Sequence, residues 1–195
     1  MNYWMVVRLL FACAGIICGS GYVNSQSAVT DQKCEGEVRT VRHVTLATPR
    51  GSAFGILCLD DGDSFSVGPT WVRLAHIDAP RLSRNCLVAG NDVPARCRLG
   101  LAALAELSEL LASGAHCKAE QRDRFNRWVA TCTTADGIDI SAELVKRGYA
   151  CNATAFDREG SLRDFETLAR AAPRGLWKTP FGFTLTKACV ANRRF

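Results

Sequence analysis

The order of the sequence patterns constrains the fold of this chain most strongly, because segments typical of β-strands come first and most segments typical of helices come later. Alternating apolar residues indicate strands, whereas apolar residues three or four positions apart indicate helices. These patterns predict strands at residues 37–47, 54–59, 65–67, 71–77, 115–119 and 128–133, and helices at residues 99–111, 140–147 and 162–172. Elements segregated in this way favour an α+β fold, and a small closed β-barrel flanked by helices fits the order.

The length of the chain suits one domain. Its 195 residues, of which 48% are hydrophobic, are enough to build a single core. No internal repeat or low-complexity segment interrupts the sequence. We therefore expect one domain over residues 29–180 and a C-terminal tail over residues 181–195.

The first 28 residues have the layout of a secretory signal. An apolar run extends from Trp4 to Ile17, Arg8 is its one charged residue, and small and polar residues follow. The run is shorter than the roughly 20 residues that span a bilayer. We expect residues 1–28 to be a signal peptide and the mature protein to be secreted or periplasmic. An uncleaved N-terminal membrane anchor remains the alternative.

Cysteine usage agrees with export. Two of the ten cysteines lie in the apolar leader and the other eight follow it: Cys34, Cys58, Cys86, Cys97, Cys117, Cys132, Cys151 and Cys189. An even number after a secretory signal indicates up to four disulfides, and the lack of a C-x-x-C pair in this part of the sequence argues against zinc. Cys117 and Cys132 flank the predicted hairpin and are expected to be bonded. Cys86 and Cys97, in the loop after residue 80, are a second candidate pair.

Two carboxylates and one arginine occupy positions that call for a chemical explanation. Asp63 lies in a predicted turn and Asp78 lies at the end of a strand, just before Pro80. Folding can bring both carboxylates to one calcium ion, which takes hard oxygen ligands; alternatively, residues 61–63 form only a hairpin turn. Arg73 lies within an apolar strand, where a guanidinium needs an anionic partner or a ligand unless the position is an exposed edge.

The basic residues do not by themselves show whether the protein binds a polyanion. The chain has 24 Lys+Arg and 19 Asp+Glu, and its formal charge of +5 is compatible with a polyanion partner or with solubility alone. Arg127 lies at the tip of the predicted hairpin, where loops commonly carry function, although it is equally a solvated turn arginine.

Several segments, taken in order, resemble the thermonuclease family, the staphylococcal-nuclease-like domains. They are DGDSF at 61–65, VRLAHIDAP at 72–80, DRFNRWVA at 123–130, ELVKRGYA at 143–150, AR at 169–170 and GLW at 175–177. The resemblance covers about residues 35–180. It implies a five-stranded OB-fold β-barrel with three flanking helices and a calcium-dependent phosphodiesterase site.

The resemblance also implies roles for individual residues. Asp63 and Asp78 would bind calcium with the Ala79 carbonyl nearby, and Arg73 and Arg127 would clamp the phosphate. Arginine suits this task because its planar fork of donors is permanently charged. The expected partner is nucleic acid, DNA or RNA, and we expect a monomer.

The sequence departs from the family pattern at the general base. The family continues Asp-x-Pro with Glu, but this chain has Arg81, and residues 79–91 contain no acidic residue and a further arginine, Arg84. An arginine does not accept a proton at neutral pH. His76 is a candidate substitute base, or simply a packed or exposed histidine. Asn126 replaces the family's Gly and tolerates a left-handed backbone.

Three functions follow from these patterns. The first is an exported, calcium-dependent nuclease with impaired chemistry. The second is a non-catalytic binder of nucleic acid or other polyanions, with Arg73, Arg81, Arg84 and Arg127 in one cationic cleft. The third is an exported protein-interaction module.

Overall fold

The fold is seen in a computed structural model that describes residues 44–55, 57–82, 95–153 and 162–178. All of these residues belong to one compact unit, Asp31–Phe195. The predicted signal peptide at 1–28 and the predicted tail at 181–195 lie outside the described residues, so both stay predictions.

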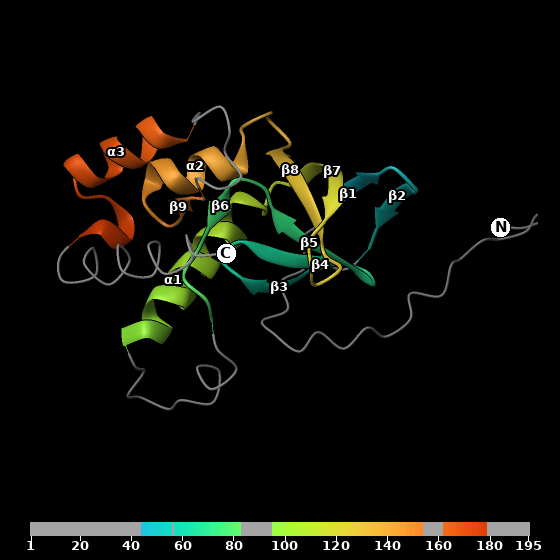
Figure 1. Cartoon of the computed structure of the whole chain (residues 1–195), viewed down its shortest axis with the longest axis horizontal. Coiled ribbons are helices and arrows are strands. Elements are labelled where there is room, and N and C mark those ends of the chain that lie inside the picture. Colours follow the sequence, from blue (N-terminus) through green and yellow to red (C-terminus); the bar gives the residue numbers. More distant parts are fainter. Residues whose placement is uncertain (1–43, 56, 83–94, 154–161, 179–195) are drawn as a thin grey trace, which may run out of the picture. The chain divides into compact units, whose positions relative to one another are not determined.

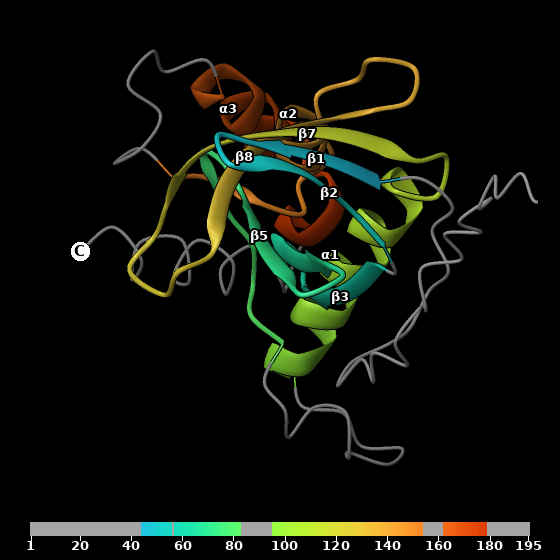
Figure 2. The same cartoon turned by 90° about the vertical axis from the view of Figure 1, so that its right-hand side faces the viewer.

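A mixed β-sheet forms the centre of this unit. Its strands are β1 (Val44–Thr48), β2 (Gly51–Phe54), β3 (Leu57–Asp61), β4 (Ser64–Val67), β5 (Thr70–Leu74), β7 (Ala115–Arg122) and β8 (Trp128–Thr134). They are ordered β2-β1-β7-β8-β5-β4-β3, with parallel pairing between β1 and β7 and between β5 and β8 and antiparallel pairing elsewhere. Figure 2 shows the strands curling from β2 and β1 around to β3. A separate antiparallel pair joins β6 (Ile77–Asp78) to β9 (Cys151–Asn152).

Two of the three α-helices pack against this sheet, and the third packs on the second. The helices are α1 (Ala95–Leu110), α2 (Ile140–Arg147) and α3 (Arg163–Ala171), and a 3₁₀ turn, η2 (Gly175–Trp177), follows them. Helix α1 contacts β3, α2 contacts β8, and α3 contacts α2 (Figure 1). The side chain of Asp139 caps α2 by accepting the Ala142 N–H at 2.9 Å, which satisfies one of the unpaired donors of the first turn.

One apolar core lies between the curled sheet and the helices. Its largest fully buried side chains come from both kinds of element and include Leu46, Leu57, Phe65, Leu74, Leu104, Leu107, Ile140 and Leu144. Burial of a side chain of this size contributes about 1.5–3 kcal/mol each. The helices are therefore needed to cover one side of the sheet, as an α+β fold requires.

The α+β class and the three helices predicted from sequence are confirmed, but the strand count is not. The main sheet has seven strands in the described residues rather than five, and it forms a curled half-barrel with β2 and β3 at its ends. One reason is that residues 44–54 form a hairpin, β1–β2, in which Thr48 pairs with Gly51.

Two of the predicted strands are divided. The sequence predicts one strand at 54–59, but Phe54 ends β2 and β3 begins at Leu57. It also predicts one strand at 71–77, but the chain turns between β5 and β6 because His76 adopts a left-handed backbone with φ of 66°. Alternating apolar residues do not reveal such a turn.

A disulfide joins the two strands of the β7–β8 hairpin. Cys117 and Cys132 lie directly opposite each other in β7 and β8 and are bonded, which is the pairing expected from the sequence. Cys97 is also disulfide-bonded, as are Cys58 and Cys151. Cys86 lies outside the described residues, so the pairing of Cys86 with Cys97 stays a prediction.

Removing the Cys117–Cys132 bond is expected to destabilise the protein. The two residues are 15 positions apart, and in the chain-entropy model a loop of this size contributes about 3 kcal/mol through the unfolded state. The double variant Cys117→Ala/Cys132→Ala should lower the free energy of unfolding by about that amount in urea titrations. Unchanged stability, or free thiols at these positions in the wild type, would contradict the assignment.

Candidate functional site

The turn between β3 and β4 holds a buried carboxylate at a fixed position. A Cβ atom at Gly62 would clash with Ala103 of α1 and with Ala79, so only glycine lets the turn approach the helix this closely. Asp63 follows this glycine, is only 3% exposed, and accepts the Ala79 N–H at 3.0 Å. The close packing of α1 therefore sets the place of the Asp63 carboxylate.

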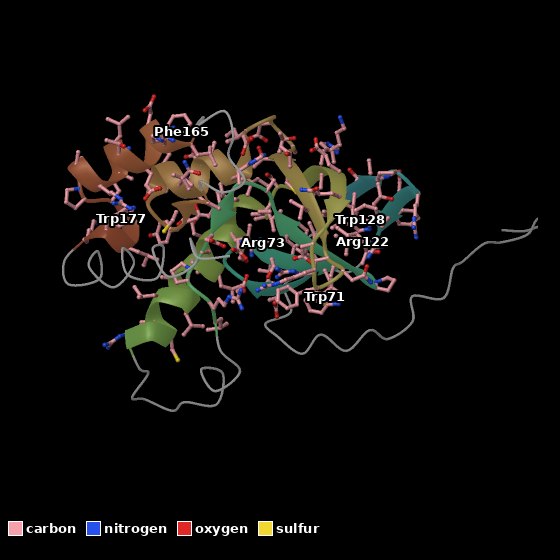
Figure 3. The ribbon with its side chains drawn as sticks, viewed as in Figure 1. Trp71, Arg73, Arg122, Trp128, Phe165 and Trp177 are labelled. Atoms are coloured by element: carbon pink, nitrogen blue, oxygen red, sulfur yellow. A yellow bond between two sulfur atoms is a disulfide. The ribbon has the colours of Figure 1, made fainter. Side chains whose placement is uncertain are left out.

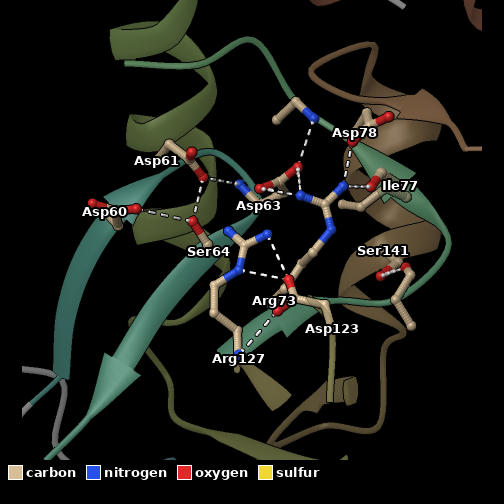
Figure 4. Close-up of polar contacts among 12 residues, drawn as sticks. Asp60, Asp61, Asp63, Ser64, Arg73, Ile77, Asp78, Asp123, Arg127 and Ser141 are labelled. Carbon is tan, nitrogen blue, oxygen red and sulfur yellow. Dashed lines mark hydrogen bonds and ion pairs between the residues drawn. The ribbon is translucent and has the colours of Figure 1, made fainter. Parts of the chain in front are cut away.

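Arg73 brings this carboxylate together with a second one. Its guanidinium lies 3.3 Å from Asp63 (Nη1 to Oδ2), donates to Asp78 Oδ1, and donates to the Ile77 carbonyl at 3.0 Å. Figure 4 shows Asp63 and Asp78 on two sides of this guanidinium. Arg73 has the anionic partners that its apolar strand requires, and Asp63 and Asp78, far apart in sequence, share one site.

The charges in this cluster shift one another's proton affinities. Burial, together with the neighbouring charge of Asp61, raises the pKa of Asp63 well above its usual value, and Arg73 opposes that shift. Burial alone would lower the pKa of Arg73, but Asp63 and Asp78 raise it overall. Asp61 accepts hydrogen bonds from Ser64 Oγ at 2.6 Å and from the Asp63 N–H at 3.2 Å. Asp63 therefore keeps its proton to a higher pH than an exposed aspartate does.

The tip of the β7–β8 hairpin holds a second arginine through its own aspartate. Asp123 Oδ1 accepts the backbone N–H groups of Phe125 at 2.9 Å and Arg127 at 3.0 Å, while Asp123 Oδ2 accepts Arg127 Nε at 2.8 Å. Partial burial alone would raise the pKa of Asp123, but these hydrogen bonds lower it overall. Asn126 has the left-handed backbone, φ 64°, that its sequence position led us to expect. Asp123 was missed by the sequence analysis, although an acidic residue four positions before a turn arginine is a usable signal.

An open pocket of about 310 Å³ lies at the site. Its lining residues come from four separate segments and are Asp60, Trp71, Arg81, Phe125 and Arg127. Asp60 Oδ2 accepts Ser64 Oγ at 3.3 Å, and Ser64 bonds to Asp61, so hydrogen bonds connect the pocket wall to the carboxylate turn. The pocket and the carboxylate cluster are therefore parts of one site.

Helix α1 also fixes the main chain at Arg81. A Cβ atom at Gly100 would lie 2.8 Å from the Arg81 carbonyl oxygen, so the helix and residue 81 touch backbone to backbone. The Arg81 side chain is exposed and lines the pocket. Residue 81, where the resemblance implies a general base, thus lies at the pocket and is an arginine.

Trp71 is a site residue that the sequence analysis missed. It lies two positions before Arg73, on the same face of β5, and 47% of its surface is exposed (Figure 3). The signal that could have found it is the alternation of the strand, because Val72 and Leu74 share the buried face and leave Trp71 on the other one. Its place beside Arg81 and Arg127 depends on the pairing of β5 with β8, which the sequence does not give.

Three further residues were predicted at the site, and the structure describes two of them. Arg84 lies outside the described residues. Ala79 is at the cluster and donates its N–H to Asp63. His76 is exposed in the turn between β5 and β6, where its carbonyl accepts the Ala153 N–H at 2.8 Å.

The carboxylates of the cluster are the kind of ligand that calcium takes, but there are too few of them to complete a calcium site. Asp63 and Asp78 are hard oxygen donors of the kind that calcium takes, and both lie against the guanidinium of Arg73. In the described ranges, however, no group of three or more His, Cys, Asp or Glu side chains is arranged to hold a metal ion. Calcium takes about six to eight oxygen ligands, so most of them would have to be main-chain carbonyls, water or substrate.

Comparisons with known proteins agree with this geometry. The family model described as Staphylococcal nuclease homologue matches residues 71–179. The match begins at Trp71 and includes Arg73, Asp78 and Arg127, whereas Asp63 precedes it. A curated relative, "Succinoglycan biosynthesis protein ExoI" from Rhizobium meliloti (strain 1021), is 29% identical over 120 residues. That alignment covers 60% of this chain and 61% of the relative, so the chain spans less than two thirds of its length.

The matched segment contains strands β6 to β9, all of β5 except Thr70, and all three α-helices, and it takes in more than half of the chain. The chain belongs to the staphylococcal nuclease homologue family.

Proposed function

We propose that this chain binds nucleic-acid phosphodiesters at the pocket and hydrolyses them slowly in a calcium-dependent reaction. The observation that carries the proposal is the convergence of Asp63 and Asp78 on Arg73, with Arg127 and Arg81 lining the adjoining pocket. Phosphodiester cleavage needs cations around the phosphate and a water molecule that is positioned for attack.

The arginines supply the first of these needs. Arg73 is held by two carboxylates and a carbonyl, so it is oriented before substrate arrives. Arg127 is held in the same manner by Asp123. Preorganised cations stabilise developing phosphate charge without reorganisation during the reaction. A calcium ion, when bound, would add Lewis-acid polarisation of the phosphoryl oxygen, and Asp63, Asp78 and the Ala79 carbonyl would hold it.

Arg81 is the reason to expect slow hydrolysis. General-base catalysis typically contributes about 10²–10⁴-fold, and an arginine does not provide it. The same residue adds a cation beside the phosphate. It therefore favours retention of the substrate over its cleavage.

A second candidate function is non-catalytic binding of nucleic acid or other polyanions. The specific observation that favours it is again the exposed Arg81 in the pocket. The two candidates differ in one measurable respect, because only the first consumes substrate when calcium is added.

We also propose that the protein is exported, to the periplasm or the medium. Disulfide bonding of Cys58, Cys97, Cys117, Cys132 and Cys151 supports an oxidising compartment. Within the described ranges, no helix is both long and apolar enough to cross a membrane.

Replacing either carboxylate is expected to weaken calcium binding. Asp63→Asn and Asp78→Asn each remove one of two charged ligands, so calorimetry should show at least a tenfold loss of affinity, about 1.4 kcal/mol. Asp136→Asn, in the exposed turn after β8, is the matched control and should bind as the wild type does. Wild-type protein that binds no calcium at millimolar concentration and yet retains DNA or RNA would favour the non-catalytic binder.

Arg81→Glu is expected to raise turnover and lower affinity together. The change restores the family's carboxylate and should accelerate cleavage of DNA or RNA in calcium by about 10²–10⁴-fold. It should also weaken binding of uncleaved nucleic acid in chelator, because one cationic contact becomes repulsive.

Lys118→Glu, on the exposed face of β7 and away from the pocket, makes the same charge change and should leave turnover unaltered. Fast cleavage by the wild type, with no gain in Arg81→Glu, would show that the lack of a carboxylate at residue 81 does not limit the reaction. His76 would then be the next group to replace.

A further inference from the structure

A disulfide-bonded cysteine lies directly across a strand pair from one of the site carboxylates. In the β6–β9 ladder, Asp78 is paired with Cys151, and Ile77 is paired with Asn152. Cys151 is disulfide-bonded and only 2% exposed. Because Asp78 accepts a hydrogen bond from Arg73, the strand that carries Cys151 also supports one side of the carboxylate cluster.

The β6–β9 ladder is too short to be stable without support. Each strand has two residues, and one further backbone bond, from the Ala153 N–H to the His76 carbonyl at 2.8 Å, extends the pairing. An isolated pair of strands is at best marginally stable in water. The position of β6, and of Asp78 with it, therefore depends on what holds β9 in place.

Helix α3 supports β9 from a second side. The Asn152 N–H donates to Glu166 Oε2 at 2.9 Å, and Glu166 also accepts a hydrogen bond from Arg170. The guanidinium carbon of Arg170 lies 4.3 Å from the ring centre of Trp177, which belongs to η2. Polar and ring contacts thus connect β9 through α3 to η2.

The same contacts bring the start of the C-terminal segment close to Cys151. The Leu176 N–H donates to the Gly148 carbonyl at 3.0 Å, so η2 is docked three residues before Cys151. Cys189 follows the last residue of η2 by 12 positions (189 minus 177). A segment of that length reaches at most about 40 Å, which is ample for a return to β9.

The positions of the other cysteines favour Cys189 as the partner of Cys151. Two of the eight cysteines after the leader are bonded to each other in the β7–β8 hairpin. Cys97 lies in the first turn of α1, and the backbone of residues 81–82 packs on the same helix, only four positions before Cys86. These two are therefore favoured as one pair. Of the remaining partners, Cys189 is the one that follows the segment docked beside β9.

We propose, on the basis of the function and the export proposed above, that a disulfide between Cys151 and Cys189 holds β9 against β6, and that the site is complete only once this bond has formed. In its formation the two thiols lose two electrons and two protons, and a disulfide oxidant is reduced to two thiols by exchange. Without the bond, β9 separates more readily from β6, and Asp78 loses its fixed place beside Arg73.

This dependence links activity to the compartment. Thiols stay reduced in the cytoplasm and form disulfides after export. Protein that has not yet been exported therefore lacks the fixed carboxylate and cleaves slowly, so the nucleic acid of the producing cell is not degraded during synthesis.

Peptide mapping without reduction tests the pairing. Digestion of the oxidised protein and mass spectrometry should give one linked peptide that contains Cys151 and Cys189 and separates on reduction. Linkage of Cys151 to any other cysteine would overturn the inference.

Cys189→Ser tests the coupling to the site, because it removes the bond without altering any described residue. Hydrogen exchange measured by mass spectrometry should become at least about tenfold faster in peptides that contain residues 76–78 and 151–153. Cleavage of DNA or RNA in calcium should fall about 10–100-fold, the range typical of groups that orient a metal ligand.

Cys117→Ser/Cys132→Ser is the matched control, since it also removes one disulfide, but from the β7–β8 hairpin. It should leave exchange at residues 76–78 unchanged. After reduction with dithiothreitol and reoxidation, its cleavage should recover as the peptide that links Cys151 to Cys189 reappears. Cys189→Ser should stay slow after the same treatment.

The outcomes separate this inference from the proposed function. Unchanged exchange at residues 76–78 and unchanged cleavage in Cys189→Ser would overturn the coupling while the nuclease function stands. Wild-type protein that neither binds nor cleaves nucleic acid would overturn the proposed function, whereas faster exchange at residues 76–78 in Cys189→Ser would still support the tie between Cys151 and Asp78.

Discussion

The guanidinium of Arg73 is the contact on which the arrangement of the site depends. It joins Asp63 in the β3–β4 turn to Asp78 in β6, and it also bonds to the Ile77 carbonyl. These partners belong to segments that are separate in the sequence and share no strand pairing. Breaking a buried ion pair of this kind typically costs about 3–5 kcal/mol, because the remaining charge is left without a partner. Arg73 therefore fixes the relative positions of Asp63 and Asp78.

The sequence was most informative where one segment determines its own structure. Helix α2 has the bounds 140–147 that its apolar spacing predicts, and the structure adds the reason: Asp139 accepts the Ala142 N–H and Gly148 terminates the helix. The β7–β8 hairpin and its Cys117–Cys132 bond follow in the same way from local pattern and symmetry about the turn. The approximate location of Asp63, Asp78, Arg73 and Arg127 came from motifs whose order is typical of the family.

The rest depended on contacts between distant segments, which periodicity does not encode. The pocket requires the parallel pairing of β5 with β8, and this pairing alone makes Trp71 a neighbour of Arg127. The break at His76 depends on β6 pairing with β9, more than seventy residues later. Asp123 was passed over because its importance lies in four hydrogen-bonding and ionic contacts within one turn, which become visible only in three dimensions.

The backbone contact between Gly100 and Arg81 has a consequence for how this scaffold can change. Helix α1 holds residue 81 by its main chain, so the position in space is the same whatever side chain is attached, while that side chain remains in solvent. A substitution there alters the charge and proton affinity of the pocket without disturbing the packing beneath it. The fold thus separates the placing of a reactive group from its chemical identity. A scaffold of this kind can change the charge of its pocket by replacement of one exposed side chain.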